Sequence, residues 1–107
     1  MVVSRFDICL VALDPTLGHE IQKTRPCVII SPDEINHADW TLIVAPLSSK
    51  LKNLPTRIPV EFAGKKGQVL LDQIRSIDPK RLVKRLGKVD SKTGNRILEC
   101  LQEMFSV

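Results

Sequence analysis

Residues 18–31, Gly-His-Glu-Ile-Gln-Lys-Thr-Arg-Pro-Cys-Val-Ile-Ile-Ser, join a polar loop directly to an apolar strand. Pro26 fixes its own φ angle, lacks a backbone donor and biases Arg25 toward an extended conformation. The junction between loop and strand is therefore stiff. Such a loop can present a cation and a carboxylate, Arg25 and Glu20, to a phosphate group. The alternative is a solvated loop in which Arg25 only pairs with Glu20.

Apolar or alternating runs on both sides of this loop predict short strands. They cover residues 8–13, 27–30, 42–47, 57–62 and 68–71. Pro46 indicates an edge or a bulge near the end of the third run, and residues 64–67 are expected to form the turn before the fifth. Residues 82–89 fit either a strand or a turn-like link, because Gly87 interrupts any helix there.

The C-terminal segment has a clear helical pattern. Its apolar side chains recur at helical spacing, at Ile97, Leu98, Leu101, Met104 and Phe105. Asp90 or Ser91 is expected to cap the first turn, which Gly94 weakens. We expect the apolar stripe to pack on the sheet; a partner-binding helix is the alternative. Short strands followed by one helix predict a mainly β chain, a small, strongly bent antiparallel sheet or barrel. Trp40 is expected to cover the core rather than a dimer interface.

Length and charge limit the classes of protein that fit. The 107 residues predict a single domain spanning residues 1–107, and the net charge of +4 favours an acidic partner such as nucleic acid. The three cysteines lack a Cys-x-x-Cys spacing and a histidine cluster, so we expect reduced, buried thiols and no metal site. No signal peptide or membrane-spanning run is visible, which predicts a cytoplasmic chain.

Five segments together resemble the MazF/PemK family of toxins from bacterial toxin–antitoxin pairs. They are Asp-Pro-Thr-Leu-Gly-His-Glu at 14–20, Thr-Arg-Pro-Cys-Val-Ile-Ile at 24–30, Ile-Val-Ala-Pro-Leu-Ser at 43–48, Gly-Gln-Val-Leu-Leu-Asp-Gln-Ile-Arg-Ser-Ile-Asp at 67–78 and Leu-Gly at 86–87. The resemblance implies an SH3-like small barrel of bent antiparallel strands with a C-terminal α-helix. It also implies a homodimer, sequence-specific cleavage of single-stranded RNA without metal or cofactor, and an antitoxin whose acidic, extended tail covers the RNA groove.

The residue types suit this chemistry. The RNA 2′-OH attacks the adjacent phosphorus and leaves a 2′,3′-cyclic phosphate and a 5′-OH end. The reaction needs a proton acceptor, a proton donor and positive charge beside the phosphorane, which a fixed cation can supply. Arg25 matches the family's catalytic arginine, and a guanidinium loses its proton only above about pH 12, which favours a stabilising role. Ser48 stands where the family usually has a catalytic threonine and keeps the hydroxyl.

Three further residues are candidates for the general base. His19 and Glu20 match residues that line the site in PemK-like members, and Asp72 matches a catalytic aspartate of that branch. The branch's arginine two positions before this aspartate is Leu70 here. That departure favours the MazF-type pair of Arg25 and Ser48, and the base stays open among the three.

A second group is expected to contact RNA through backbone and loop contacts. It consists of Thr24, Lys50, Lys52, Arg57, Gln73, Arg75 and Ser76. Gln73 and Asp72 also fit a structural, hydrogen-bonding role beside the site. For Arg75 the alternative is a surface ion pair with Asp78.

Two other functions fit parts of the pattern. One is a non-catalytic RNA-binding or regulatory barrel, against which Arg25 and the hydroxyl of Ser48 argue. The other is a toxin that acts by protein contact, as the CcdB gyrase poisons do on the same kind of barrel. Those poisons use a C-terminal Trp-Gly-Ile, whereas this chain ends in Phe-Ser-Val at 105–107.

Overall fold

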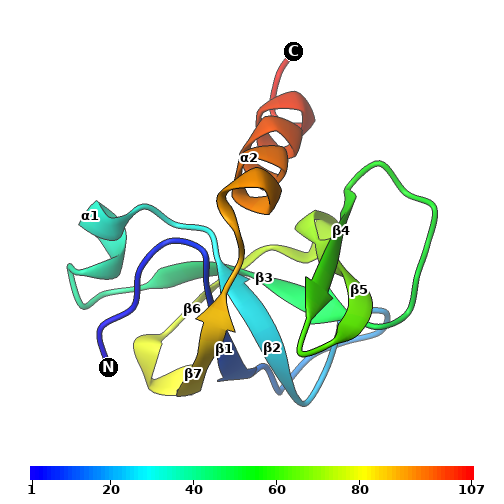
Figure 1. Cartoon of the computed structure of the whole chain (residues 1–107). Coiled ribbons are helices and arrows are strands. Elements are labelled where there is room, and N and C mark those ends of the chain that lie inside the picture. Colours follow the sequence, from blue (N-terminus) through cyan, green and yellow to red (C-terminus); the bar gives the residue numbers. More distant parts are fainter.

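The computed structural model describes all 107 residues and is built on one bent, antiparallel sheet (Figure 1). Its strands are β1 (Asp7–Ala12), β2 (Thr24–Ile29), β3 (Leu42–Ser48), β4 (Arg57–Phe62), β5 (Lys65–Leu70), β6 (Arg75–Ile77) and β7 (Leu82–Lys88). The order is β4-β5-β3-β2-β1-β7, with β6 paired to β3. The helices are α1 (Asp33–Asn36) and α2 (Ser91–Met104), with 3₁₀ turns η1 (Leu71–Gln73) and η2 (Pro79–Arg81). The mainly β fold with a C-terminal helix is therefore confirmed, and an SH3-like description fits it.

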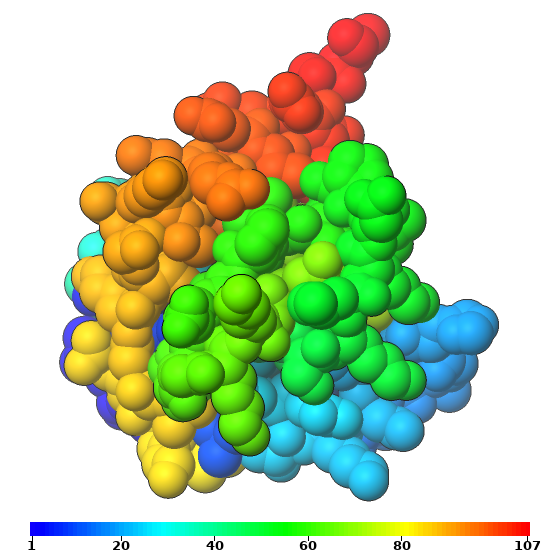
Figure 2. All heavy atoms as spheres, turned by 45° about the vertical axis from the view of Figure 1, so that its right-hand side comes forward, coloured from blue at the N-terminus to red at the C-terminus, as the bar shows by residue number.

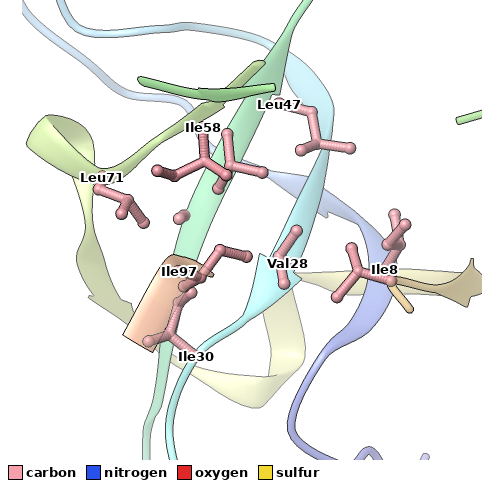
Figure 3. Packing of buried hydrophobic residues seen from close by; sticks show 10 residues of the cluster. Ile8, Val28, Ile30, Leu47, Ile58, Leu71 and Ile97 are labelled. Atoms are coloured by element: carbon pink, nitrogen blue, oxygen red, sulfur yellow. The ribbon is translucent and has the colours of Figure 1, made fainter. Parts of the chain in front are cut away.

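The central strands read as unbroken apolar runs because they are buried on both faces. In β1, Ile8 faces a cluster that includes Ile97 of α2, while the next residue, Cys9, faces a second cluster under the other side of the sheet. Figure 3 shows Ile97 among the side chains of the first cluster, beside Ile30. Burial raises the pKa of the Cys9 thiol to about 11 and that of Cys27 to about 12, in keeping with the predicted buried thiols. Cys100 is only partly buried, so the prediction was wrong for this residue.

The sheet bends until its two ends meet. β1 pairs with β7 from Asp7 opposite Lys88 to Val11 opposite Leu82, so residues 82–89 contain a strand rather than a link. A Cβ atom on Gly87 would lie 3.3 Å from the ring of Phe62. The β4–β5 hairpin thus contacts β7 through side chains, without a shared ladder of hydrogen bonds.

Helix α2 begins at the predicted cap. The Asp90 carboxylate accepts a hydrogen bond from the Thr93 N–H at 2.7 Å. Close packing against Phe6 explains the glycine at position 94, because a Cβ atom there would lie 2.6 Å from the Phe6 ring. Ile97 is fully buried, and Leu101 and Met104 pack against the same cluster, so the predicted packing of the helix on the sheet is confirmed for these residues. Phe105 lies just beyond the helix and is 72% exposed, so its inclusion in the packed stripe was wrong. Neither helix is long and apolar enough to cross a membrane.

Pro46 lies where β3 changes partners. Val44 is the last β3 residue paired with β6, and Leu47 is the first paired with β5. Pro46 falls between the two pairings, where its missing N–H takes no hydrogen bond from β5 or β6. The proline thus marks a change of partner within a central strand whose register with β2 is unbroken, so the prediction of an edge or a bulge was wrong.

Two other predictions were wrong. The turn before β5 is Ala63-Gly64, whose φ angles are 53° and 75°, and Lys65 and Lys66 already belong to the strand. Two residues with positive φ match the twist of a tight hairpin, so no longer turn is needed. Trp40 does not cover the core; its side chain is 79% exposed, in the segment that follows α1.

Candidate active site

A polar cavity of about 480 Å³ lies between the β1–β2 loop, the loop that follows β3, and η1. Figure 2 shows the two loops next to each other, the first in light blue and the second in green. The predicted site residues that line the cavity are His19, Glu20, Arg25, Ser48, Lys50, Lys52, Arg57, Asp72 and Gln73. The fold thus brings together residues that are up to 54 positions apart in the sequence.

Arg25 stands at the beginning of β2 with a free guanidinium end. Its Nε donates to the Gln22 carbonyl oxygen at 3.1 Å, and its terminal amino groups have no partner in the chain. Glu20 does not pair with it; its Oε1 accepts a hydrogen bond from the Leu17 N–H at 2.7 Å. The alternative of an Arg25–Glu20 ion pair is therefore wrong, and Arg25 can offer two donors to an anion.

Ser48, the last residue of β3, lies opposite Gln68 of β5. Its Oγ accepts a hydrogen bond from the Lys50 N–H at 3.1 Å, which begins the loop after the strand. Gly67 lets β5 approach this point closely, because a Cβ atom there would lie 2.7 Å from the Ser48 carbonyl oxygen. The position of the Ser48 hydroxyl therefore depends on a glycine in the neighbouring strand.

Arg57 and Asp72 form an ion pair at the wall of the cavity. Arg57 donates from Nε to Oδ1 at 2.7 Å and from Nη2 to Oδ2 at 3.0 Å, and the Thr56 hydroxyl donates to Oδ1 at 3.0 Å. The hydrogen bonds from Arg57 are the main cause that holds the pKa of the Asp72 carboxyl below its usual range. Because the Arg57 side chain is only 8% exposed, its charge is largely used inside the protein.

Gln73 meets the β1–β2 loop with its side-chain amide. The oxygen accepts a hydrogen bond from the Ile21 N–H at 2.7 Å, and the nitrogen donates to the His19 carbonyl at 3.4 Å. Both contacts are structural, in line with one of the two roles expected for this residue.

Comparisons with known proteins show the family to which the chain belongs. The family model described as PemK-like, MazF-like toxin of type II toxin-antitoxin system matches residues 4–105. The chain belongs to this toxin family. The Bacillus subtilis protein named Endoribonuclease EndoA is 31% identical over 108 residues, covering 95% of this chain and 93% of its own length. The Escherichia coli protein named Endoribonuclease PemK is 36% identical over 110 residues, covering 97% and 83%.

Solved structures show the same fold. MazF from Deinococcus radiodurans superposes with a TM-score of 0.87 at 23% identity, over 100% of this chain and 99% of that one. A MazE-MazF structure from the same organism gives a TM-score of 0.80 at 19% identity, over 100% and 98%.

Three residues that were expected to contact RNA do not line this cavity of the toxin. Thr24 is exposed at the first position of β2, and Ser76 is exposed on β6. Arg75 donates from Nη1 to the Leu13 carbonyl oxygen at 3.0 Å and lines an adjoining hollow of about 370 Å³ together with Glu20. It makes no ion pair with Asp78, so that alternative is wrong.

The unpaired charges of the toxin's cavity are mostly positive. Lys50 and Lys52 have no carboxylate within ion-pair distance, and Arg25 has none either. Such cations suit a polyanionic strand. Sequence reasoning missed Gly67 and Gln68, whose roles depend on pairing with Ser48 and with the loop after β3, and no pattern of residues in the sequence shows that pairing.

Proposed function

We propose that this toxin is a metal-independent, sequence-specific endoribonuclease that cleaves single-stranded RNA, and mRNA in the cytoplasm in particular. The observation that carries the proposal is the shared cavity of Arg25 and Ser48, in which the terminal amino groups of Arg25 are free to meet a phosphate. The curated relatives that match nearly the whole chain are both named endoribonucleases.

The proposed step is an attack of the RNA 2′-OH on the adjacent phosphorus. A bond forms between O2′ and phosphorus, and the bond from phosphorus to O5′ breaks. A base takes the 2′-OH proton and O5′ receives one, which gives a 2′,3′-cyclic phosphate and a 5′-OH end. Arg25 donates to the phosphorane oxygens, where negative charge develops, and the Ser48 hydroxyl supplies a further hydrogen bond at the phosphate.

The base is assigned to the β1–β2 loop. Asp72 is a poor proton acceptor because its two oxygens already accept three hydrogen bonds and its pKa is lowered. One carboxylate oxygen of Glu20 accepts a hydrogen bond from the Leu17 N–H, and the other oxygen is free. The His19 ring has no hydrogen-bond partner in the chain. We therefore propose Glu20 or His19 as the general base. Lys50 and Lys52 are proposed to contact the RNA backbone.

The proposal includes two protein partners. A cognate antitoxin would neutralise the enzyme, because the family is defined by toxin–antitoxin pairs and one structural neighbour is a MazE-MazF structure. An acidic, extended antitoxin tail fits the free cations of the cavity. A second copy of the chain would form a homodimer, which light scattering of the purified protein tests directly.

Incubation of the purified protein in EDTA with a long single-stranded RNA and its DNA counterpart tests the activity. We expect cleavage of RNA alone, with 5′-OH ends and loss of activity in Arg25→Ala. Because DNA lacks the 2′-OH, cleavage of both strands would contradict the mechanism. Two intact strands with a folded protein would favour the non-catalytic RNA-binding function or a toxin that acts by protein contact.

A further inference from the structure

Two glutamine side chains hold the two loops that border the cavity, and each does so with one accepted and one donated hydrogen bond to the loop backbone. The Gln68 oxygen accepts a hydrogen bond from the Lys52 N–H at 3.0 Å, and its nitrogen donates to the Lys52 carbonyl oxygen at 2.9 Å. The Gln73 oxygen likewise accepts a hydrogen bond from the Ile21 N–H of the β1–β2 loop, and its nitrogen donates to the His19 carbonyl oxygen. Each primary amide therefore takes the place of a peptide group in a neighbouring strand.

Other long-range hydrogen bonds hold these loops only at their ends, from Arg75 and Arg81 to the Leu13 and Asp14 carbonyls and from the Leu71 N–H to the Thr56 carbonyl. Within residues 15–22, the hydrogen bonds to distant parts of the chain all come from Gln73. Within residues 49–55, they come from Gln68 and from one weak thiol contact, Cys100 to the Pro55 carbonyl at 3.4 Å. Loss of either amide would leave the middle of its loop held only from the two ends.

The two loops carry different parts of the proposed chemistry. The loop held by Gln73 carries His19 and Glu20, the candidate bases. The loop held by Gln68 carries Lys50 and Lys52, the lysines proposed to contact the RNA backbone, and such contacts would be the same before and during the reaction. An interaction that is equal in the ground state and the transition state changes KM, whereas one needed only in the transition state changes kcat.

We propose that Gln68 and Gln73 are positioning residues with separable effects, Gln68 on RNA binding and Gln73 on the chemical step. This inference rests on the proposed ribonuclease function. Neither side chain needs to touch the reacting atoms, because each acts through the loop that it holds.

Kinetics of single variants test the separation. The substrate is a short RNA that contains the cleavage site mapped on the long RNA, and binding is measured with the same oligonucleotide carrying a 2′-deoxy sugar at the cleaved position. We expect Gln68→Leu to raise KM and Kd about tenfold with kcat within about twofold of the unaltered protein. We expect Gln73→Leu to lower kcat about tenfold or more with Kd within about twofold.

Two further variants sharpen the comparison. A Gln73→Glu variant keeps the acceptor for the Ile21 N–H but cannot donate to the His19 carbonyl, so its kcat should lie between those of the unaltered protein and Gln73→Leu. A Gln102→Leu variant removes an exposed glutamine of α2 whose side chain makes no hydrogen bond, so its kcat and Kd should equal those of the unaltered protein.

Hydrogen exchange of the free protein provides a readout that does not depend on activity. The Lys52 amide should exchange faster only in Gln68→Leu, and the Ile21 amide only in Gln73→Leu. Unchanged exchange at these amides, or equal effects of both variants on KM and kcat, would overturn the inference. If the unaltered protein cleaves no RNA, the proposed function fails, and the exchange data alone still decide whether the two amides anchor their loops.

Discussion

The guanidinium of Arg57 holds the carboxylate of Asp72 through two parallel hydrogen bonds, 2.7 Å and 3.0 Å long. The pair joins β4 to η1 at the wall of the cavity and leaves little net charge there. It also engages the most buried cation of the site inside the protein, whereas the terminal amino groups of Arg25 have no partner.

The first prediction concerns the identity of the base. Asp72→Asn should keep RNA cleavage within about tenfold of the unaltered protein, because the carboxylate is occupied by Arg57 and takes no proton. Glu20→Gln or His19→Asn, whichever removes the base, should cost about 100-fold or more in kcat. Single-turnover cleavage of the mapped RNA measures all three, and a collapse of activity in Asp72→Asn would return the base to this aspartate.

The second prediction concerns stability in acid. The pKa of Asp72 is lowered in the folded state, so its contribution to the free energy of unfolding is present above the unfolded value of about 4 and is lost as the pH falls through the lower, folded pKa. Asp72→Asn should therefore be less stable than the unaltered protein by about 1 kcal/mol near pH 7, a modest amount for a pair that is partly exposed.

Urea unfolding at several pH values measures this contribution. The difference between the two proteins should shrink between about pH 4 and pH 2. A difference that stays constant over this range would show that the ionised form of Asp72 is not what stabilises the fold.

The third prediction concerns the guanidinium fork of Arg25. Arg25→Ala should lower kcat about 100-fold, and Arg25→Lys should recover only part of the loss, because an ammonium cannot donate to two phosphate oxygens in a plane. The side chain is exposed, so the melting temperature of both variants should remain unchanged. Cleavage by Arg25→Lys at nearly the unaltered rate would contradict stabilisation by the fork.

The fourth prediction concerns the close approach of β5 to Ser48. Gly67→Ala places a Cβ atom 2.7 Å from the Ser48 carbonyl oxygen, a backbone atom, so β3 must shift. We expect a loss of stability of about 1–3 kcal/mol together with a clear loss of cleavage, whereas Ser48→Thr should remain active.

Gly64→Ala is the matched control for this variant. Gly64 has a φ angle of 75° and no atom within 4 Å of an added Cβ, so the substitution costs stability, about 1–2 kcal/mol, without moving Ser48. Equal activity of the two alanine variants would show that the approach at Gly67 does not position the hydroxyl.

The fifth prediction concerns Gly94 in α2. Alanine is normally the better helix former, but here its Cβ atom would meet the Phe6 ring at 2.6 Å. Gly94→Ala should therefore destabilise the fold by about 1–3 kcal/mol, and adding Phe6→Leu should make the alanine less harmful than it is alone. A double-mutant cycle with thermal unfolding measures this coupling, and simple additivity of the two changes would argue against the contact.

The elements that were predictable from the sequence are those with a strong local pattern. The runs in β1, β2 and β3 have continuous apolar residues, β4 alternates, and α2 has both its periodicity and its cap at Asp90. The short strand β6 has only three residues, Arg75–Ile77, and depends on pairing with β3, so no local pattern indicates it. The turn between β4 and β5 was predicted over residues 64–67, too long by the two lysines that begin β5, because lysines are common in turns as well.

The candidate site shows the same division. Arg25 and Ser48 were found through segments that resemble a known family, and the fold places both in one cavity. The ion pair of Arg57 with Asp72, 15 residues apart, and the attachment of Gln73 to a loop more than 50 residues away are tertiary contacts. Charged and amide side chains have many partners to choose from, and only the folded chain decides which ones they meet.

The pairing of β1 with β7 links the candidate site to a strand late in the sequence. Residues 7–11 find one of their two neighbouring strands only after residues 82–88 have been made. Arg81 then donates to the carbonyl oxygen of Ala12 at 3.0 Å and to that of Asp14 at 2.6 Å, at the base of the loop that carries the candidate catalytic groups. The base of this loop therefore gains its attachments only once residues 81–88 have folded against β1, so the arrangement of the cavity depends on pairing between residues 71 to 81 positions apart in the sequence.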